Sequence, residues 1–170
     1  YYLVATAEAS SNLARFDGAQ YGFRAADTKN IVEMFSRTRA QGFGPEVKRR
    51  IMIGTHALSA GFYDAFYVKA LKVRTLIKQD YDKALAQADL ILAPTSPFPA
   101  FAAGARSADP LAMYLCDTYT IPTNLVGHPG MSVPFGSGAG GLPVGVQVLA
   151  PTLGEPMMFR VAAALERAAR

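Results

Sequence analysis

The sequence contains few of the residues from which metal sites and disulfides are built. Its 170 residues include one cysteine, Cys116, and two histidines, His56 and His128, which lie far apart. A single cysteine excludes an intrachain disulfide and favours a reducing compartment. No group of cysteines and histidines has the spacing of metal ligands, so we expect no metal site and predict that each histidine is structural or exposed.

Long apolar runs and nucleotide-binding motifs are also absent from the sequence. No run approaches the roughly 20 apolar residues of a membrane-spanning helix, so we expect no membrane association. The phosphate-binding pattern GxxxxGK[ST] and the esterase pattern GxSxG do not occur. The glycine-rich residues 136–141 (GSGAGG) lie between two apolar runs, which indicates a flexible turn. We therefore expect no cofactor in this chain.

The composition is that of a folded globular protein. Hydrophobic residues make up 51% of the chain and charged residues 18%, which argues against disorder. The length fits one domain. The 17 lysines and arginines exceed the 13 acidic residues by only four charges, which is weak support for nucleic-acid binding.

Predicted helices alternate with short apolar strands along the chain. This alternation predicts an α/β fold with a mixed β-sheet flanked by helices. Strands are expected at residues 1–5, 90–93, 131–135 and 143–149, of which the last two form a hairpin. Helices are expected at residues 6–16, 27–42, 45–58, 63–86, 109–119 and 155–169.

The first five residues (YYLVA) indicate whether the sequence is part of a longer protein. They include no initiator methionine and read as a buried strand. Because natural termini usually lie at the surface, we expect the chain to be a piece of a longer protein.

Two adjacent arginines lie in the helix predicted to begin at Pro45. Counted from Val47 at roughly 100° per residue, Arg49 falls on the solvent face and Arg50 at the edge of the apolar stripe. The small Gly54 beside Arg50 leaves room for its guanidinium to bind a carboxylate through two hydrogen bonds. A structural salt bridge of Arg50 is an equally weighted alternative.

An isolated carboxylate, Asp117, lies in the otherwise uncharged residues 111–119 (LAMYLCDTY). Burying a carboxylate is costly unless a cation or several hydrogen-bond donors satisfy it. We therefore expect the partner of Asp117 to be either an arginine of the protein or a cationic group of a substrate. An arginine together with an aspartate could hold a free amino acid, by its carboxylate and its ammonium group respectively.

Six stretches, taken together, resemble one enzyme family over essentially the whole chain and in family order. EASSNLARFDG and EVKRRIMIG are similar to the glutaminase subunits, or A subunits, of the glutamyl-tRNA(Gln)/aspartyl-tRNA(Asn) amidotransferases, which are amidase-signature enzymes. GLPVGVQ and the pattern GxPxxSVPxG are shared by amidases in general. The stretches are residues 1–22, 42–54, 65–80, 109–114, 121–135 and 141–147.

The resemblance implies that residues 1–170 are the C-terminal part of a single amidase-signature domain. Such an enzyme hydrolyses glutamine with a Ser–cis-Ser–Lys triad, in which a neutral lysine deprotonates serine. The lysine and both serines belong to a segment that is not in this sequence, so we expect no catalytic residue here and no activity of the piece alone. Ser10 and Ser11 do not match the catalytic pair and are predicted to be structural.

The resemblance also implies a glutamine-binding role for three residues of this chain. Arg50 would bind the substrate carboxylate, Asp117 its ammonium group, and Tyr1 would contact the substrate from the end of the predicted strand. The helical face of Arg50 and the burial cost of Asp117 select the same two residues independently.

The family further implies partners and a location. Ammonia would pass to a B subunit that uses ATP and magnesium to activate misacylated tRNA, with a small C subunit completing a cytoplasmic heterotrimer. The alternatives are another amidase-signature hydrolase of neutral amides, or a catalytically silent module that docks on the ATP-using subunit or on tRNA.

Overall fold

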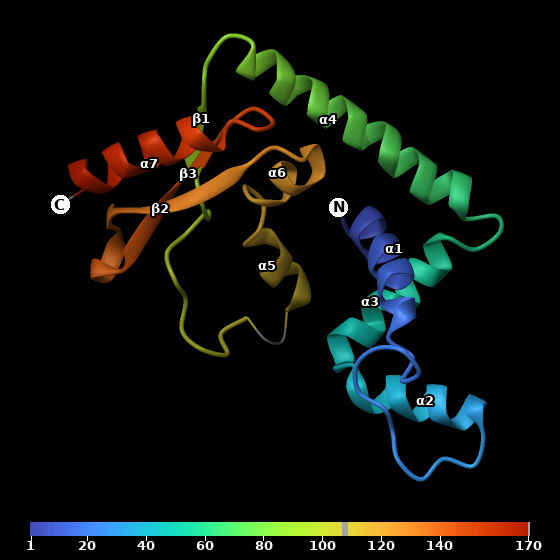
Figure 1. Ribbon diagram of the computed structural model, residues 1–170. Coiled ribbons are helices and arrows are strands. Elements are labelled where there is room, and N and C mark those ends of the chain that lie inside the picture. Colours follow the sequence, from blue (N-terminus) through green and yellow to red (C-terminus); the bar gives the residue numbers. More distant parts are fainter. Residues whose placement is uncertain (107–108, 170) are drawn as a thin grey trace. The chain divides into compact units, whose positions relative to one another are not determined.

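The computed structural model describes residues 1–106 and 109–169 of the chain, which form two compact units. The first unit consists of residues 1–73 and the second of residues 74–170 (Figure 1). Helix α4 (Lys69–Leu85) begins at the end of the first unit and continues into the second. The two units are treated separately below.

The first unit is helical. It contains α1 (Tyr2–Asn12), the 3₁₀ turn η1 (Leu13–Arg15), α2 (Ile31–Gly42), α3 (Pro45–Ala57) and the π-helical turn η2 (Tyr63–Val68). Helix α1 packs against α3, and Gly54 lies where they meet. A Cβ atom at Gly54 would overlap the carbonyl oxygen of Thr6 and would lie 2.9 Å from the Cβ of Ser10. Ser10 Oγ and Thr55 Oγ1 share a hydrogen bond of 2.8 Å across the same contact.

The strand predicted at residues 1–5 is wrong, because these residues lead directly into helix α1. Val4 and Ala7, three positions apart, are both buried. A short apolar run suits a buried helix as well as a buried strand, and periodicity over five residues does not separate the two.

Helix α2 begins later than the sequence predicts. Its cap is Asn30, whose side chain accepts a hydrogen bond from Glu33 N at 2.9 Å. Glu33 in turn accepts one from Lys29 N at 2.9 Å. Asp27 instead has a positive φ of 54°, which excludes it from a right-handed helix.

The second unit contains a three-stranded sheet with strand order β1–β3–β2. The strands are β1 (Ile91–Pro94), β2 (Gly130–Ser137) and β3 (Pro143–Leu149), with the 3₁₀ turn η3 (Ala139–Gly141) between β2 and β3. The predicted hairpin of β2 and β3 is confirmed, with Val133 opposite Val146. The predicted α/β class is also confirmed. Both pairings in the described sheet are antiparallel, whereas a mixed sheet was predicted; the connection after β1 is long enough for either direction.

Helix α7 (Glu155–Ala168) packs against β2 and β3 and closes the core of the second unit. Its inward residues Met158 and Ala162 meet Val133 and Val148 from the sheet, and all four are at least 95% buried. The helix predicted at residues 109–119 is shorter than expected and ends at Leu115 as α5 (Pro110–Leu115), and a further short helix that was not predicted, α6 (Ile121–Val126), follows it. Pro122, which was expected to end a helix, lies in the first turn of α6, where a proline is favoured.

Among residues 1–106 and 109–169, no helix combines the length and apolar character needed to cross a membrane.

Candidate functional site

Arg50 lies on α3, and its guanidinium is already paired. Its Nε donates to Glu46 Oε1 at 2.8 Å, one helical turn earlier, and Arg49 Nε donates to the other carboxylate oxygen at 2.9 Å. The Arg50 side chain is 41% exposed and that of Arg49 is 49% exposed, a small difference in the direction that the helical phase predicts. The structural salt bridge weighed as the alternative role of Arg50 is therefore present, and the glutamine-binding role stays a prediction.

The same two arginines change the acidity of Glu46. Hydrogen bonds from Arg50 first, and from Arg49 second, hold the pKa of the Glu46 carboxyl below its ordinary value. A carboxyl whose pKa is lowered on folding adds stability above its unfolded pKa, and that contribution is lost as the pH falls through the folded pKa. Because the pair is exposed, we expect the effect on overall stability to be small.

We expect the substitution Arg50→Gln to raise the pKa of Glu46 more than Arg49→Gln does, because the Arg50 hydrogen bond is the larger cause. Carbon-detected NMR titration of the Glu46 carboxyl would measure both shifts. An equal response to the two substitutions would contradict this ranking.

Tyr1 lies at the start of α1. Its carbonyl oxygen accepts a hydrogen bond from Ala5 N at 2.8 Å, and its ring meets that of Tyr2 edge to face with 5.1 Å between centroids. The residue is 39% exposed. Its predicted position at a strand end is replaced by one at a helix start.

Asp117 lies in the turn between α5 and α6. Its carbonyl oxygen accepts hydrogen bonds from Thr120 N at 3.1 Å and Ile121 N at 2.9 Å, which fixes the start of α6. The residue is exposed, so the predicted burial of its carboxylate is wrong. The segment was assumed to be buried because it is apolar, yet Leu111 and Leu115 are 67% and 55% exposed. Tyr1 and Arg50 belong to the first unit and Asp117 to the second, so their joint role also stays a prediction.

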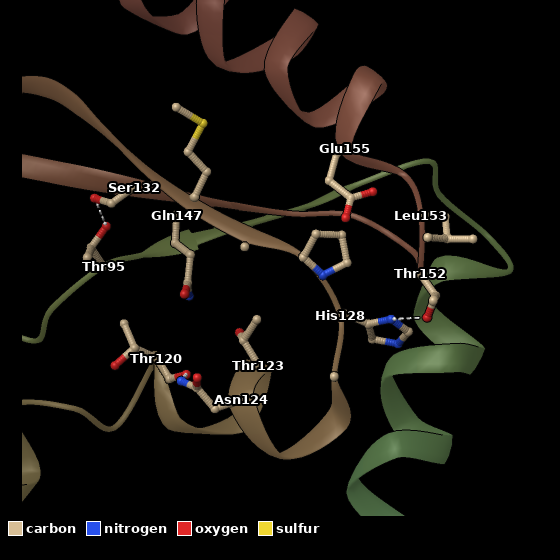
Figure 2. Close-up of a pocket in the computed structure, with 14 residues that line it drawn as sticks. Thr95, Thr120, Thr123, Asn124, His128, Ser132, Gln147, Thr152, Leu153 and Glu155 are labelled. Carbon is tan, nitrogen blue, oxygen red and sulfur yellow. Dashed lines mark hydrogen bonds between the residues drawn. The ribbon is translucent and has the colours of Figure 1, made fainter. Parts of the chain in front are cut away.

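A polar cavity of about 700 Å³ lies in the second unit (Figure 2). Its wall is formed by α6, the start of β2, a residue of β3 and the loop that leads into α7. Several lining residues contribute hydroxyl groups: Thr95, Thr120, Thr123, Ser132 and Thr152. Asn124, Gln147 and Glu155 add two amides and a carboxylate.

His128, at the edge of this cavity, has both ring nitrogens engaged. Its Nε2 lies 3.2 Å from Asp82 Oδ1 on α4, and its Nδ1 lies 3.2 Å from Thr152 Oγ1. The residue is 8% exposed. The pKa of Asp82 is lowered by a hydrogen bond from Lys78 first, with a smaller contribution from His128. Each histidine was predicted to be either structural or exposed. These contacts confirm that His128 is structural, and His56 is exposed.

Sequence reasoning did not identify this cavity as a site. The available signal was the polar spacing of Thr120, Thr123 and Asn124, which places three polar groups on neighbouring turns of a short helix. Gln147 gave no signal, because a single amide in an apolar strand does not by itself indicate a site. Within the described part of the chain, no group of three or more His, Cys, Asp or Glu residues could hold a metal ion.

Comparison with known proteins identifies the relatives of this chain. The family model described as Amidase matches residues 1–159. The A subunit of the glutamyl-tRNA(Gln) amidotransferase of Cyanothece sp. is 60% identical over 168 residues, which are 99% of this chain and 35% of the relative. The corresponding protein of Koribacter versatilis is 59% identical with the same coverage. The chain thus spans about a third of the length of the curated relatives it matches.

Solved structures give the same result. The crystal structure of the glutamyl-tRNA(Gln) amidotransferase A subunit from Thermotoga maritima matches with a TM-score of 0.60 and 51% identity, over 80% of this chain and 30% of that one. A crystal structure of an amidase matches with a TM-score of 0.61 and 25% identity, over 99% of this chain and 36% of that one.

Proposed function

The chain belongs to the amidase family, and on this premise we propose that it is the glutamine-binding part of an amidotransferase glutaminase subunit. The observation that carries the proposal is the 60% identity with the A subunit of a glutamyl-tRNA(Gln) amidotransferase over 99% of the chain. The complete protein would hydrolyse glutamine and supply ammonia for the amidation of misacylated Glu-tRNA(Gln) or Asp-tRNA(Asn).

In this proposal the chain binds substrate and leaves bond cleavage to a Ser–cis-Ser–Lys triad elsewhere in the complete protein. The Arg50 guanidinium binds the α-carboxylate of glutamine, the exposed Asp117 carboxylate binds its α-ammonium group, and the Tyr1 ring contacts the bound substrate. Two charges of opposite sign match the two charged groups of a free amino acid. Glu46 accepts a hydrogen bond from Arg50 Nε at 2.8 Å, one helical turn earlier, and so orients the guanidinium.

The partners proposed with this role are a B subunit that uses ATP and magnesium and a small C subunit, in a cytoplasmic heterotrimer. Misacylated tRNA would be bound mainly by the ATP-using partner, and the surplus of four positive charges on this chain gives little support for direct tRNA binding.

We expect Arg50→Ala in the complete protein to raise the KM for glutamine roughly tenfold or more, because it removes a charge-assisted hydrogen bond to the substrate. Steady-state glutaminase kinetics would measure this change. Arg49→Ala is the matched control, since Arg49 also binds Glu46 but lies on the exposed face. An unchanged KM in Arg50→Ala, or the same increase in both variants, would remove Arg50 from the site.

A second candidate is a hydrolase of neutral amides, which the 25% identical amidase structure favours. Such an enzyme needs neither Arg50 nor Asp117 to bind its substrate. Comparing glutamine with simple uncharged amides as substrates of the complete protein separates the two functions. No hydrolysis of either would support the third candidate, a docking module without activity.

A further inference from the structure

The polar cavity of the second unit contains a buried group that the protein itself does not satisfy. Thr123 is 8% exposed, and among the described residues its Oγ1 is the buried side-chain oxygen that has no hydrogen-bond partner. Leaving a buried hydroxyl unpaired costs roughly 1–3 kcal/mol. Figure 2 shows the side chain projecting from α6 into the cavity, toward the part of β3 that carries Gln147.

The polar groups around Thr123 include acceptor oxygens that the protein does not use. Asn124 Nδ2 donates to the carbonyl oxygen of Thr120 at 2.9 Å, and Gln147 Nε2 donates to that of Tyr119 at 3.0 Å. These contacts fix which end of each amide is the nitrogen, and they leave each amide with its oxygen as an acceptor and a second N–H as a donor. Thr120 Oγ1 likewise donates to a main-chain carbonyl, that of Asp117, at 3.2 Å.

The remaining polar side chains of the wall are occupied with one another. Thr95 Oγ1 and Ser132 Oγ are 2.8 Å apart, and Thr152 Oγ1 is bonded to His128. Each pair thus uses part of its hydrogen-bonding capacity within the wall.

The charge of the wall has one sign. Glu155 contributes a carboxylate, and no lysine or arginine lines the cavity in the part of the chain that the structure describes. Glu155 lies in the first turn of α7, where its charge offsets the partial positive charge of that helix end. An anionic ligand would therefore be repelled by the Glu155 carboxylate, with no lysine or arginine in the described wall to offset that repulsion.

We propose that this cavity binds a small ligand that presents N–H donors and carries no negative charge, with a primary ammonium group as the favoured chemistry. Its N–H groups would bond Thr123 Oγ1 and the oxygens of Asn124 and Gln147, and the Glu155 carboxylate would balance its charge. A primary carboxamide offers the same donors without the charge. The proposal does not depend on which reaction the complete protein performs.

The test is a titration of the complete protein with methylammonium chloride, acetamide and sodium acetate at constant ionic strength. The observable is the chemical shift of the Thr120 methyl group, which lines the cavity in every variant. Saturable binding of methylammonium but not of acetate is the expected result. Binding of acetate at least as strong as that of methylammonium, or no saturable binding of either nitrogen compound, would overturn the proposal.

Three substitutions test whether the ligand binds in this cavity. Thr123→Val removes the hydroxyl and keeps the shape, so it should weaken the binding of both nitrogen compounds roughly tenfold. Without ligand, the melting temperature of Thr123→Val should be unchanged or higher, because an unsatisfied group has been removed. Glu155→Gln should weaken the binding of methylammonium and leave the binding of acetamide unchanged. This difference shows whether the cavity favours an ammonium group or a carboxamide.

The third variant, Thr118→Val, is the matched control, because it removes an exposed hydroxyl that bonds Leu115 O at 2.8 Å outside the cavity. Its binding should equal that of the unmodified protein. Equal affinity of Thr123→Val and Thr118→Val would show that Thr123 takes no part, and the site would be lost while the glutaminase proposal stood unaffected.

Discussion

Replacing Gly54 with alanine is expected to lower the free energy of unfolding by roughly 3 kcal/mol. The added Cβ would overlap the Thr6 carbonyl oxygen, which belongs to the backbone of α1 and has no rotamer by which to move away. The two helices must separate, and their contact holds Val4 and Ala7 in the core of the first unit. A helical alanine is otherwise favoured over glycine by about 1 kcal/mol, so the loss comes from packing alone.

Urea unfolding, monitored by circular dichroism, measures this loss. Gly42→Ala is the matched control, because Gly42 is also helical and its Cβ would meet Phe23 at an ordinary 3.4 Å. We expect Gly42→Ala to change the stability by less than about 1 kcal/mol. A similar small change in Gly54→Ala would mean that α1 and α3 are packed less closely than described.

The second large effect is expected from Met158→Ala, which should cost roughly 3 kcal/mol of unfolding free energy. Met158 is 5% exposed and lies on α7 against Val133 and Val148 of the sheet. Truncating it removes buried methylene groups and leaves a cavity between the helix and the sheet, and the close-packed neighbours collapse only in part.

Met157→Ala makes the same chemical change one residue earlier, where the side chain is 38% exposed. We expect its cost to be below about 1 kcal/mol, since little burial is lost. Equal unfolding midpoints for the two variants, measured in the same urea titration, would contradict the assignment of Met158 to the core.

Much of the fold follows from local patterns in the sequence. The helix of residues 45–57 was predictable because Pro45 and Glu46 favour a helix start and the apolar residues recur at helical spacing. The hairpin of β2 and β3 was predictable from two apolar runs on either side of a glycine-rich turn.

Other elements depend on contacts between distant residues. Helix α1 is selected over a strand by its close approach to Gly54, roughly fifty residues later, and no local pattern in YYLVA contains that information. The exposure of Asp117 likewise depends on what packs against its apolar neighbours and not on their composition. For the candidate site, the phase of α3 predicted that Arg50 is the less exposed of the two arginines, and the difference is small, at 41% against 49% side-chain exposure. The cavity around Thr123 was out of reach, because it is assembled from α6, β3 and α7 by tertiary packing.

The strand order of the second unit has a consequence for folding during synthesis. The central strand, β3, is the last of the three to leave the ribosome, and both β1 and β2 pair with it. Strands β1 and β2 therefore remain unpaired until residue 149, the last of β3, has emerged from the ribosome. Exposed strand edges are the part of a nascent chain most prone to wrong pairing. A pause in translation shortly before β3 would thus prolong the aggregation-prone state, whereas a pause after α7 would leave the sheet already closed.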